Sequence, residues 1–131
     1  METRPINPTA WLGAFNIHHA IEVTGGQRTL YCSGQTANAA DGTPMHPADL
    51  VAQVKLAWSN VKDILSEAGM SPANVVRLNF YTTDVEQFMA SAGEIVPVYA
   101  ADGCKPVATL LGVTSLFEPS IMVEIEATAV A

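Results

Sequence analysis

The segment Met122–Ala131 reads MVEIEATAVA, and its side chains alternate almost residue by residue between apolar and polar. Because successive side chains of a β-strand point to opposite faces, this alternation predicts a strand with one buried face. The expected buried face carries Val123, Ile125, Ala127 and Ala129. The opposite face carries Met122, Glu124, Glu126 and Thr128. The two carboxylates are either solvated or meet a partner subunit or a substrate, so their surroundings decide what the protein does.

The size and composition of the chain fit one small domain. It has 131 residues, of which 49% are hydrophobic and only 15% are charged. We expect residues 1–131 to form a single domain, and the low charge indicates that part of its surface is hidden in an oligomer. The formal net charge is −7, and the six basic residues do not cluster. We therefore expect no nucleic-acid partner, because phosphates are bound by clustered cations.

The two cysteines indicate a reducing compartment. Cys32 and Cys104 lie far apart and lack the spacing of metal ligands, so we expect two free thiols, with Cys104 exposed in a loop. The first residues contain no apolar signal region, and no stretch is long enough to span a membrane. We expect a soluble, cytoplasmic protein without a membrane partner.

Short segments at both ends of the chain predict strands. Residues 1–13 are rich in proline and are expected to be irregular. Ala20–Val23 and Thr29–Ser33 read as two strands whose intervening glycines suit a hairpin turn. Val107–Val113 and Met122–Val130 are the last two strands.

The middle of the chain predicts two helices around a strand. Apolar residues recur at spacings of three and four from Val51 to Ala68, which predicts a helix that ends at Gly69. Val75–Thr82 then reads as a strand. The face expected to be apolar carries Val76, Leu78 and Phe80, and the other carries Arg77, Asn79 and Tyr81. A second helix, capped by Thr83 or Asp84, should run to about Ala101, with a kink or restart at Pro97.

This order of elements predicts an α+β fold. A mixed sheet would carry the two main helices on one face and leave the other face uncovered. An uncovered apolar sheet face in so small a chain indicates a homo-oligomer.

Several segments in this order together resemble the Rid family of reactive intermediate/imine deaminases, also called YjgF or L-PSP. They are Leu30–Gln35 (LYCSGQ), Trp58–Val61 (WSNV), Val75–Asp84 (VVRLNFYTTD), Pro106–Thr109 (PVAT) and Val123–Ala127 (VEIEA). The resemblance spans about Phe15 to Val130. It implies a chorismate-mutase-like subunit in a homotrimer whose sheets line a central barrel, with small-molecule clefts between neighbouring subunits. The family's chemistry is the hydrolysis of enamines and imines to a 2-keto acid and ammonia, without a metal or organic cofactor.

The resemblance assigns expected roles to four residues. Glu124 matches the family's water-handling glutamate, and a carboxylate in a half-dry cleft can exchange protons with substrate. Ser33 and Gly34 match a position in the cleft, where the glycine permits close backbone approach and its N–H can donate to a ligand oxygen. Glu126 is expected to be structural or part of a polar barrel interior.

The chain departs from the family pattern at Ala108. Active members carry an arginine there, which holds the substrate carboxylate with a bidentate pair of hydrogen bonds, and alanine cannot do this. Lys105, Arg77 and Arg28 are the cations that could replace it, but each is expected to be a surface charge. The loss indicates a less anionic or bulkier ligand.

Other positions of the expected cleft also differ. Leu110 replaces a family cysteine, and Ile17 and His18 lie where an aromatic ring is often found. With Ala108, and with Thr109 as an uncharged hydrogen-bonding group, these residues complete the expected substrate-binding set. His18 and His19 should point to opposite faces of a strand, so they cannot share one metal ion, although one of them could serve as an acid or base in the cleft.

The sequence supports two functional hypotheses. The first is a Rid-like hydrolase (deaminase) of an imine, enamine or related small molecule, other than simple 2-imino acids because Ala108 cannot anchor their carboxylate. The second is a non-catalytic small-molecule-binding or regulatory homotrimer. A chorismate mutase would need clustered cations for a dianionic substrate, and the endoribonuclease label attached to the family fits poorly with the acidic composition.

Overall fold

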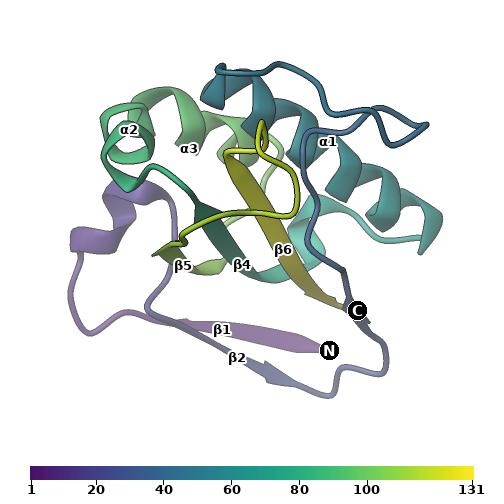
Figure 1. The fold of residues 1–131 in the computed structure, drawn as a ribbon. Helices are drawn as coiled ribbons and strands as arrows, with labels where there is room; N and C mark the ends of the chain where they lie inside the picture. Colours follow the sequence, from purple (N-terminus) through teal and green to yellow (C-terminus); the bar gives the residue numbers. More distant parts are fainter.

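The computed structural model describes residues 1–131, and its centre is a four-stranded sheet (Figure 1). The strands are β3 (Thr29–Tyr31), β6 (Val123–Val130), β4 (Val75–Thr82) and β5 (Val107–Gly112), in that spatial order. β4 and β5 are parallel, whereas β3 and β4 both pair with β6 in the antiparallel sense. The sheet is therefore mixed, as expected, and β5 forms one of its edges.

The predicted alternation of the last strand is confirmed. Val123 and Ile125 are 0% and 1% exposed, and Ala127 and Ala129 are also buried. Glu124, Glu126 and Thr128 are half-buried on the opposite face. β6 thus carries the central part of the core on one side and acids on the other.

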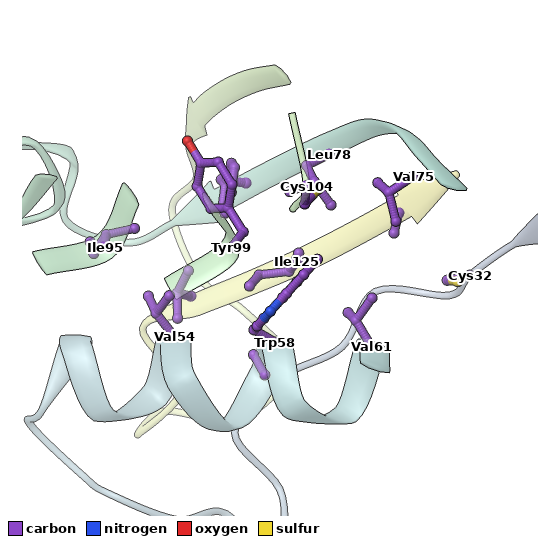
Figure 2. Packing of buried hydrophobic residues seen from close by; sticks show 14 of the residues in the cluster. Cys32, Val54, Trp58, Val61, Val75, Leu78, Ile95, Tyr99, Cys104 and Ile125 are labelled. Atoms are coloured by element: carbon purple, nitrogen blue, oxygen red, sulfur yellow. The ribbon is translucent and has the colours of Figure 1, made fainter. Parts of the chain in front are cut away.

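Helices cover only the apolar face of the sheet. α1 (Leu50–Glu67) and α3 (Ala92–Ala100) lie side by side against it (Figure 1). Figure 2 shows Val54, Trp58 and Val61 of α1 pointing toward Ile125 of β6. Asp49 caps the start of α1 by accepting a hydrogen bond from Ala52 N at 3.1 Å, and Gly69, with φ at +71°, follows its end. The predicted first helix is therefore confirmed.

A buried glutamine fastens the loop before β6 to this layer. Gln53 of α1 is fully buried; its Nε2 donates to Ser120 O (2.8 Å) and to His46 O (3.1 Å), and its Oε1 accepts from Met122 N (2.8 Å). Thr82 Oγ1 donates to Met122 O from the other side (2.8 Å). These bonds fix the point at which the chain enters β6, two residues before Glu124.

The predicted hairpin between residues 20 and 33 is wrong. β2 (Ala20–Thr24) pairs with β1 (Glu2–Ile6) in a separate two-stranded sheet (Figure 1). β3 pairs with β6 instead. The backbone N–H groups of Gln27 and Arg28 both donate to Ala131 O. The residues that follow the two glycines therefore lie against the C-terminal end of β6 and do not turn back along β2. The N-terminal residues expected to be irregular supply β1 and the 3₁₀ helix η1 (Trp11–Phe15).

The second predicted helix is broken at a different residue from the one expected. α2 (Val85–Ala90) begins at Asp84, whose carboxylate accepts from Gln87 N at 2.9 Å, and the break before α3 falls at Ser91. Ser91 N donates to the carbonyls of Gln87 and Phe88, and its own carbonyl accepts from the first turn of α3. Pro97 lies within α3 without ending it.

Two smaller expectations also fail. A β-bulge shifts the register between Val75 and Arg77, so Val75 is buried and Val76 is only half-buried. Cys104 is buried rather than exposed, and burial together with the charge of Asp102 raises the pKa of its thiol to about 12.

The short helix η2 (Pro72–Asn74) precedes β4, and none of the helices is long and apolar enough to cross a membrane.

Candidate functional site

The open face of the sheet carries two neighbouring carboxylates. Glu124 pairs across the strands with Tyr81, and Glu126 pairs with Asn79. Glu126 Oε1 accepts from Asn79 Nδ2 at 2.9 Å and from the Tyr81 hydroxyl at 3.1 Å. The hydrogen bond between the Tyr81 hydroxyl and Glu126, followed by burial and the charges of both glutamates, raises the pKa of Tyr81. Glu126 is therefore held by neighbouring side chains, whereas Glu124 makes no side-chain hydrogen bond to the chain.

Glu124 lies directly against Gly34. Gln35 N donates to Ile125 O at 2.7 Å and Ile125 N donates to Gln35 O at 2.8 Å, so the segment after β3 runs beside β6. A methyl group on Gly34 would lie 1.8 Å from Glu124 Oε1 and 2.6 Å from Cδ. Only glycine leaves room for the carboxylate in this position. The structure thus brings two of the predicted site residues together.

Ser33 sits beside this pair on the surface. Its side chain is exposed, and its carbonyl accepts from Gln35 Nε2 at 3.1 Å. Gly34 and Gln35 also line an open polar hollow of about 410 Å³, together with Asn60, Asp63 and the exposed ring of Phe117. The Ser33–Gly34 end of the strand is therefore accessible to a small polar ligand.

Ala108, Leu110 and Ile17 belong to a different place, on the helix-covered side of the sheet. They line an apolar pocket of about 320 Å³ between β5, η1 and the helices α2 and α3. Ala108 and Leu110 are opposite Leu78 and Phe80 of β4, both buried. Two hydrogen bonds on either side of Ile17 hold it at this pocket. The Asn16 side chain donates from Nδ2 to Cys104 O (2.9 Å), and the backbone His18 N donates to Pro106 O (2.8 Å).

Thr109 points away from this pocket. It pairs with Asn79, so its exposed side chain lies on the open face, and only its backbone contributes to the apolar pocket. Its hydroxyl therefore shares a face with Glu124 and not with Ala108.

His18 lines a third hollow, of about 460 Å³, together with Asn7 and Lys105. Its Nδ1 is 3.0 Å from Asn7 Nδ2, and burial, followed by the charge of Lys105, lowers its pKa. His19 N donates to Asn7 Oδ1 at 2.9 Å, and its ring Nε2 lies 3.2 Å from Thr9 Oγ1. No three histidine, cysteine or carboxylate side chains gather where they could hold a metal ion.

None of the three candidate cations lines the apolar pocket. The Arg28 guanidinium donates to Ala68 O at the end of α1, and Arg77 is exposed on β4. Lys105 lies in the hollow with His18, which touches the apolar pocket only through the shared wall residue Ile17. The pocket around Ala108 is therefore uncharged.

Apart from His18, the predicted site residues thus form two groups that do not meet within one chain. Gly34, Glu124 and Thr109 lie on or beside the open face, while Ile17, Ala108 and Leu110 lie under the helices. Trp11, Phe88 and Tyr99, which also line the pocket, were not among the predicted site residues. Trp11 lies in the segment that was expected to be irregular, and Phe88 and Tyr99 lie within the range of the predicted second helix.

These features define an α+β subunit with helices on one sheet face and acids on the other. The sequence profile of the family described as Endoribonuclease L-PSP matches residues 14–131. The chain belongs to this family, which is also called Rid or YjgF.

Individual relatives agree with this assignment. A RutC family protein of Pasteurella multocida is 34% identical over 92 residues, 64% of this chain and 66% of that protein, so the chain spans about two thirds of that relative's length. A mouse 2-iminobutanoate/2-iminopropanoate deaminase is 34% identical over 103 residues, 79% of this chain and 74% of the deaminase. The crystal structure of YyfB from Yersinia pestis, a Rid family protein of unknown function, superposes with a TM-score of 0.88 at 34% identity and covers 100% of both chains.

Proposed function

We propose that residues 1–131 form one Rid-like domain that assembles into a homotrimer and hydrolyses an imine, an enamine or a related small molecule without a cofactor. The ligand would occupy a cleft between subunits, with Glu124 as the catalytic residue. Similarity to a deaminase that acts on 2-iminobutanoate and 2-iminopropanoate supports the reaction type. The departure at Ala108 favours a substrate other than these acids.

The observation that carries the proposal is the contact between Glu124 and Gly34. The carboxylate is half-buried, makes no side-chain hydrogen bond within the chain and faces an accessible strand end. Glu126, two residues along, is occupied by Asn79 and Tyr81. Glu124 is therefore the acid on this face that is free to bind water.

The reaction needs one group that moves protons. Glu124 would take a proton from water as the oxygen adds to the imine carbon and pass that proton to the nitrogen, which gives a carbinolamine. Glu124 would then take the proton of the carbinolamine hydroxyl and give it to the nitrogen as the carbon–nitrogen bond breaks. Ammonia leaves and a carbonyl group forms. The backbone at Ser33–Gly34 would hold a ligand oxygen during these steps.

The separation of the two residue groups supports a site shared by two subunits. β3, beside Gly34, and β5, beside Ala108, are the opposite edges of the sheet. In a ring of subunits that meet head to tail, one edge of each sheet approaches the other edge of its neighbour. Glu124 of one subunit would then face the Ala108 pocket of the next.

A second candidate function is a non-catalytic small-molecule-binding or regulatory trimer. The uncharged pocket around Ala108 favours this binding function, because the arginine expected to bind the substrate carboxylate in a deaminase is missing. Such a protein would keep the cleft and bind a ligand without turnover.

The test is the release of ammonia from freshly generated 2-iminopropionate. We compare the wild type with Ala108→Arg and with the double variant Ala108→Arg/Glu124→Gln. The wild type should be slow, Ala108→Arg should be at least about tenfold faster because an arginine–carboxylate pair is restored, and Glu124→Gln should remove the gain. Glu126→Gln is the matched control and should keep most of the activity.

Two other outcomes are decisive. Fast turnover by the wild type that Glu124→Gln abolishes would also support the hydrolase, with another group in place of the arginine. Turnover no faster than the uncatalysed reaction in every variant would contradict the hydrolase and favour the binding trimer.

A further inference from the structure

The apolar pocket beside Ala108 has the size and the lining of a site for an uncharged ligand group. Its volume of about 320 Å³ lies in the range of small-molecule sites, and an apolar cavity of about 150 Å³ already admits benzene. Its wall includes the rings of Trp11, Phe15 and Phe88. A flat aromatic or branched aliphatic group fits such a lining.

No side chain in the pocket carries a charge. Among the residues that line it, only Trp11, Tyr99 and Thr109 have polar side chains. The Tyr99 hydroxyl already donates to Phe15 O, and burial raises the pKa of Tyr99, so it stays protonated and neutral. The Thr109 side chain lies on the opposite face of the sheet. A carboxylate placed here would lose its hydration without gaining a cation, which is strongly unfavourable.

The edge of β5 offers uncharged hydrogen-bonding groups instead. β5 is an edge strand, and outside its pairing with β4 it has one bridge, between Val107 and His18. An edge strand presents unpaired backbone N–H and C=O groups. A neutral ligand with a polar atom next to its apolar group can therefore bind along the strand while the apolar group enters the pocket.

From this lining we infer that the pocket selects imines or enamines that carry an aryl or branched alkyl group and no carboxylate. The inference rests on the proposed function for the reaction and names its substrate class. Water adds across the carbon–nitrogen double bond, the bond to nitrogen breaks, and the products are an uncharged aldehyde or ketone and ammonia. No oxidant or reductant is consumed.

The test uses two stable probes of nearly equal size, neutral 2-phenylacetamide and anionic phenylacetate. Their dissociation constants are measured by isothermal titration calorimetry on the intact oligomer. The wild type should bind phenylacetamide at least about tenfold more tightly than phenylacetate. Ala108→Arg should reverse this preference, because the guanidinium pairs with the carboxylate.

A matched pair of variants locates the binding. Ala92 of α3 lines the pocket, and Ala90 at the end of α2 is exposed outside it. Ala92→Leu should weaken phenylacetamide binding at least about tenfold by filling the pocket, and Ala90→Leu should leave it unchanged. Circular dichroism confirms that both variants are folded.

Three results would overturn the inference: phenylacetate bound as tightly as the amide by the wild type, neither probe bound at millimolar concentration, or binding insensitive to Ala92→Leu. The two proposals can fail separately, since probe binding requires no catalysis. If the protein binds the amide but turns over no imine, the assignment of the pocket stands and the proposed hydrolase activity is contradicted. If it turns over 2-iminopropionate in a Glu124-dependent way but does not bind the amide, the hydrolase activity stands and the assignment of the pocket is contradicted.

Discussion

At the scale of single residues, Gly34 and Glu124 depend on each other. The carboxylate occupies the space in which any other residue at position 34 would place its Cβ. Glu124 Oε1 is the end of a flexible side chain, so a larger residue at position 34 displaces the carboxylate more easily than it distorts the sheet. The glycine therefore sets where the carboxylate points.

Gly34→Ala tests this dependence. Because the new methyl group overlaps the carboxylate, we expect imine hydrolysis in the Ala108→Arg background to fall at least about tenfold, while the free energy of unfolding changes by less than about 1 kcal/mol. Activity is measured by ammonia release and stability by urea unfolding.

The control for this variant is Gly93→Ala. Gly93 lies in α3, and a Cβ there meets nothing within 4 Å, so alanine should raise the unfolding free energy by about 0.5–1 kcal/mol and leave activity intact. Equal activities for Gly34→Ala and its parent would show that the glycine does not position Glu124.

The sequence predicted which face Glu124 occupies, because alternation along one strand is a local property. Alternation within the predicted strand Val107–Val113 likewise places Ala108 and Thr109 on opposite sides of the sheet. The sequence could not show which neighbours each side chain meets, because these depend on how β5 registers with β4, where Ala108 is opposite Leu78 and Thr109 is opposite Asn79.

At the scale of elements, a carboxylate joins the end of α3 to α1. Asp102 Oδ2 accepts from Trp58 Nε1 at 2.7 Å and lies 3.0 Å from Lys62 Nζ. The hydrogen bond from Trp58, then that from Lys62, lowers the pKa of Asp102 below its ordinary value of 3.8. This link fastens the helix layer that forms the wall of the apolar pocket.

Asp102→Asn should therefore destabilise the protein in a pH-dependent way. A carboxyl group whose pKa is lowered by folding stabilises the protein above its unfolded pKa, and this contribution disappears as the pH falls through the folded pKa. We expect the variant to be about 1 kcal/mol less stable at pH 7, a modest value because the side chain is partly exposed. The difference should shrink below about pH 4.

Urea unfolding of both proteins between pH 7 and pH 3 measures this difference. Asp63→Asn, at an exposed position on α1, is the matched control and should show no such trend. A difference between wild type and Asp102→Asn that stays constant down to pH 3 would contradict the assigned role of the charge.

Element boundaries were predicted well where the signal is local and poorly where it is not. Gly69 and Asp84 were predicted helix ends, and both act through capping chemistry that involves only neighbouring residues. The glycines after β2 looked like a hairpin turn, but the end of β6 provides the hydrogen-bond acceptor for the residues that follow them. That acceptor lies about a hundred residues away in sequence, beyond the reach of local turn rules.

At the scale of the whole molecule, one subunit presents apolar and acidic surfaces that suggest an assembly. Tyr31, Phe117 and Leu111 are 79%, 71% and 50% exposed. The sheet face with Glu124 and Glu126 carries no helix, and Gly34 and Ala108 lie near opposite sheet edges. A closed ring of subunits would cover these surfaces and unite the two groups in each cleft.

In the proposed trimer, Glu124 of one subunit works with the position-108 pocket of its neighbour. We mix wild-type chains, which have the glutamate but no arginine, with Ala108→Arg/Glu124→Gln chains, which have the arginine but no glutamate. The two are unfolded together, refolded at equal concentrations, and assayed for ammonia release from 2-iminopropionate.

If each site takes one group from each of two chains, random mixing restores about a quarter of the activity of the Ala108→Arg protein. If the mixed protein is no more active than the sum of its two parents, the site is not shared between subunits in this way. The proposed pairing of Glu124 with the position-108 pocket of the neighbouring subunit would then be wrong.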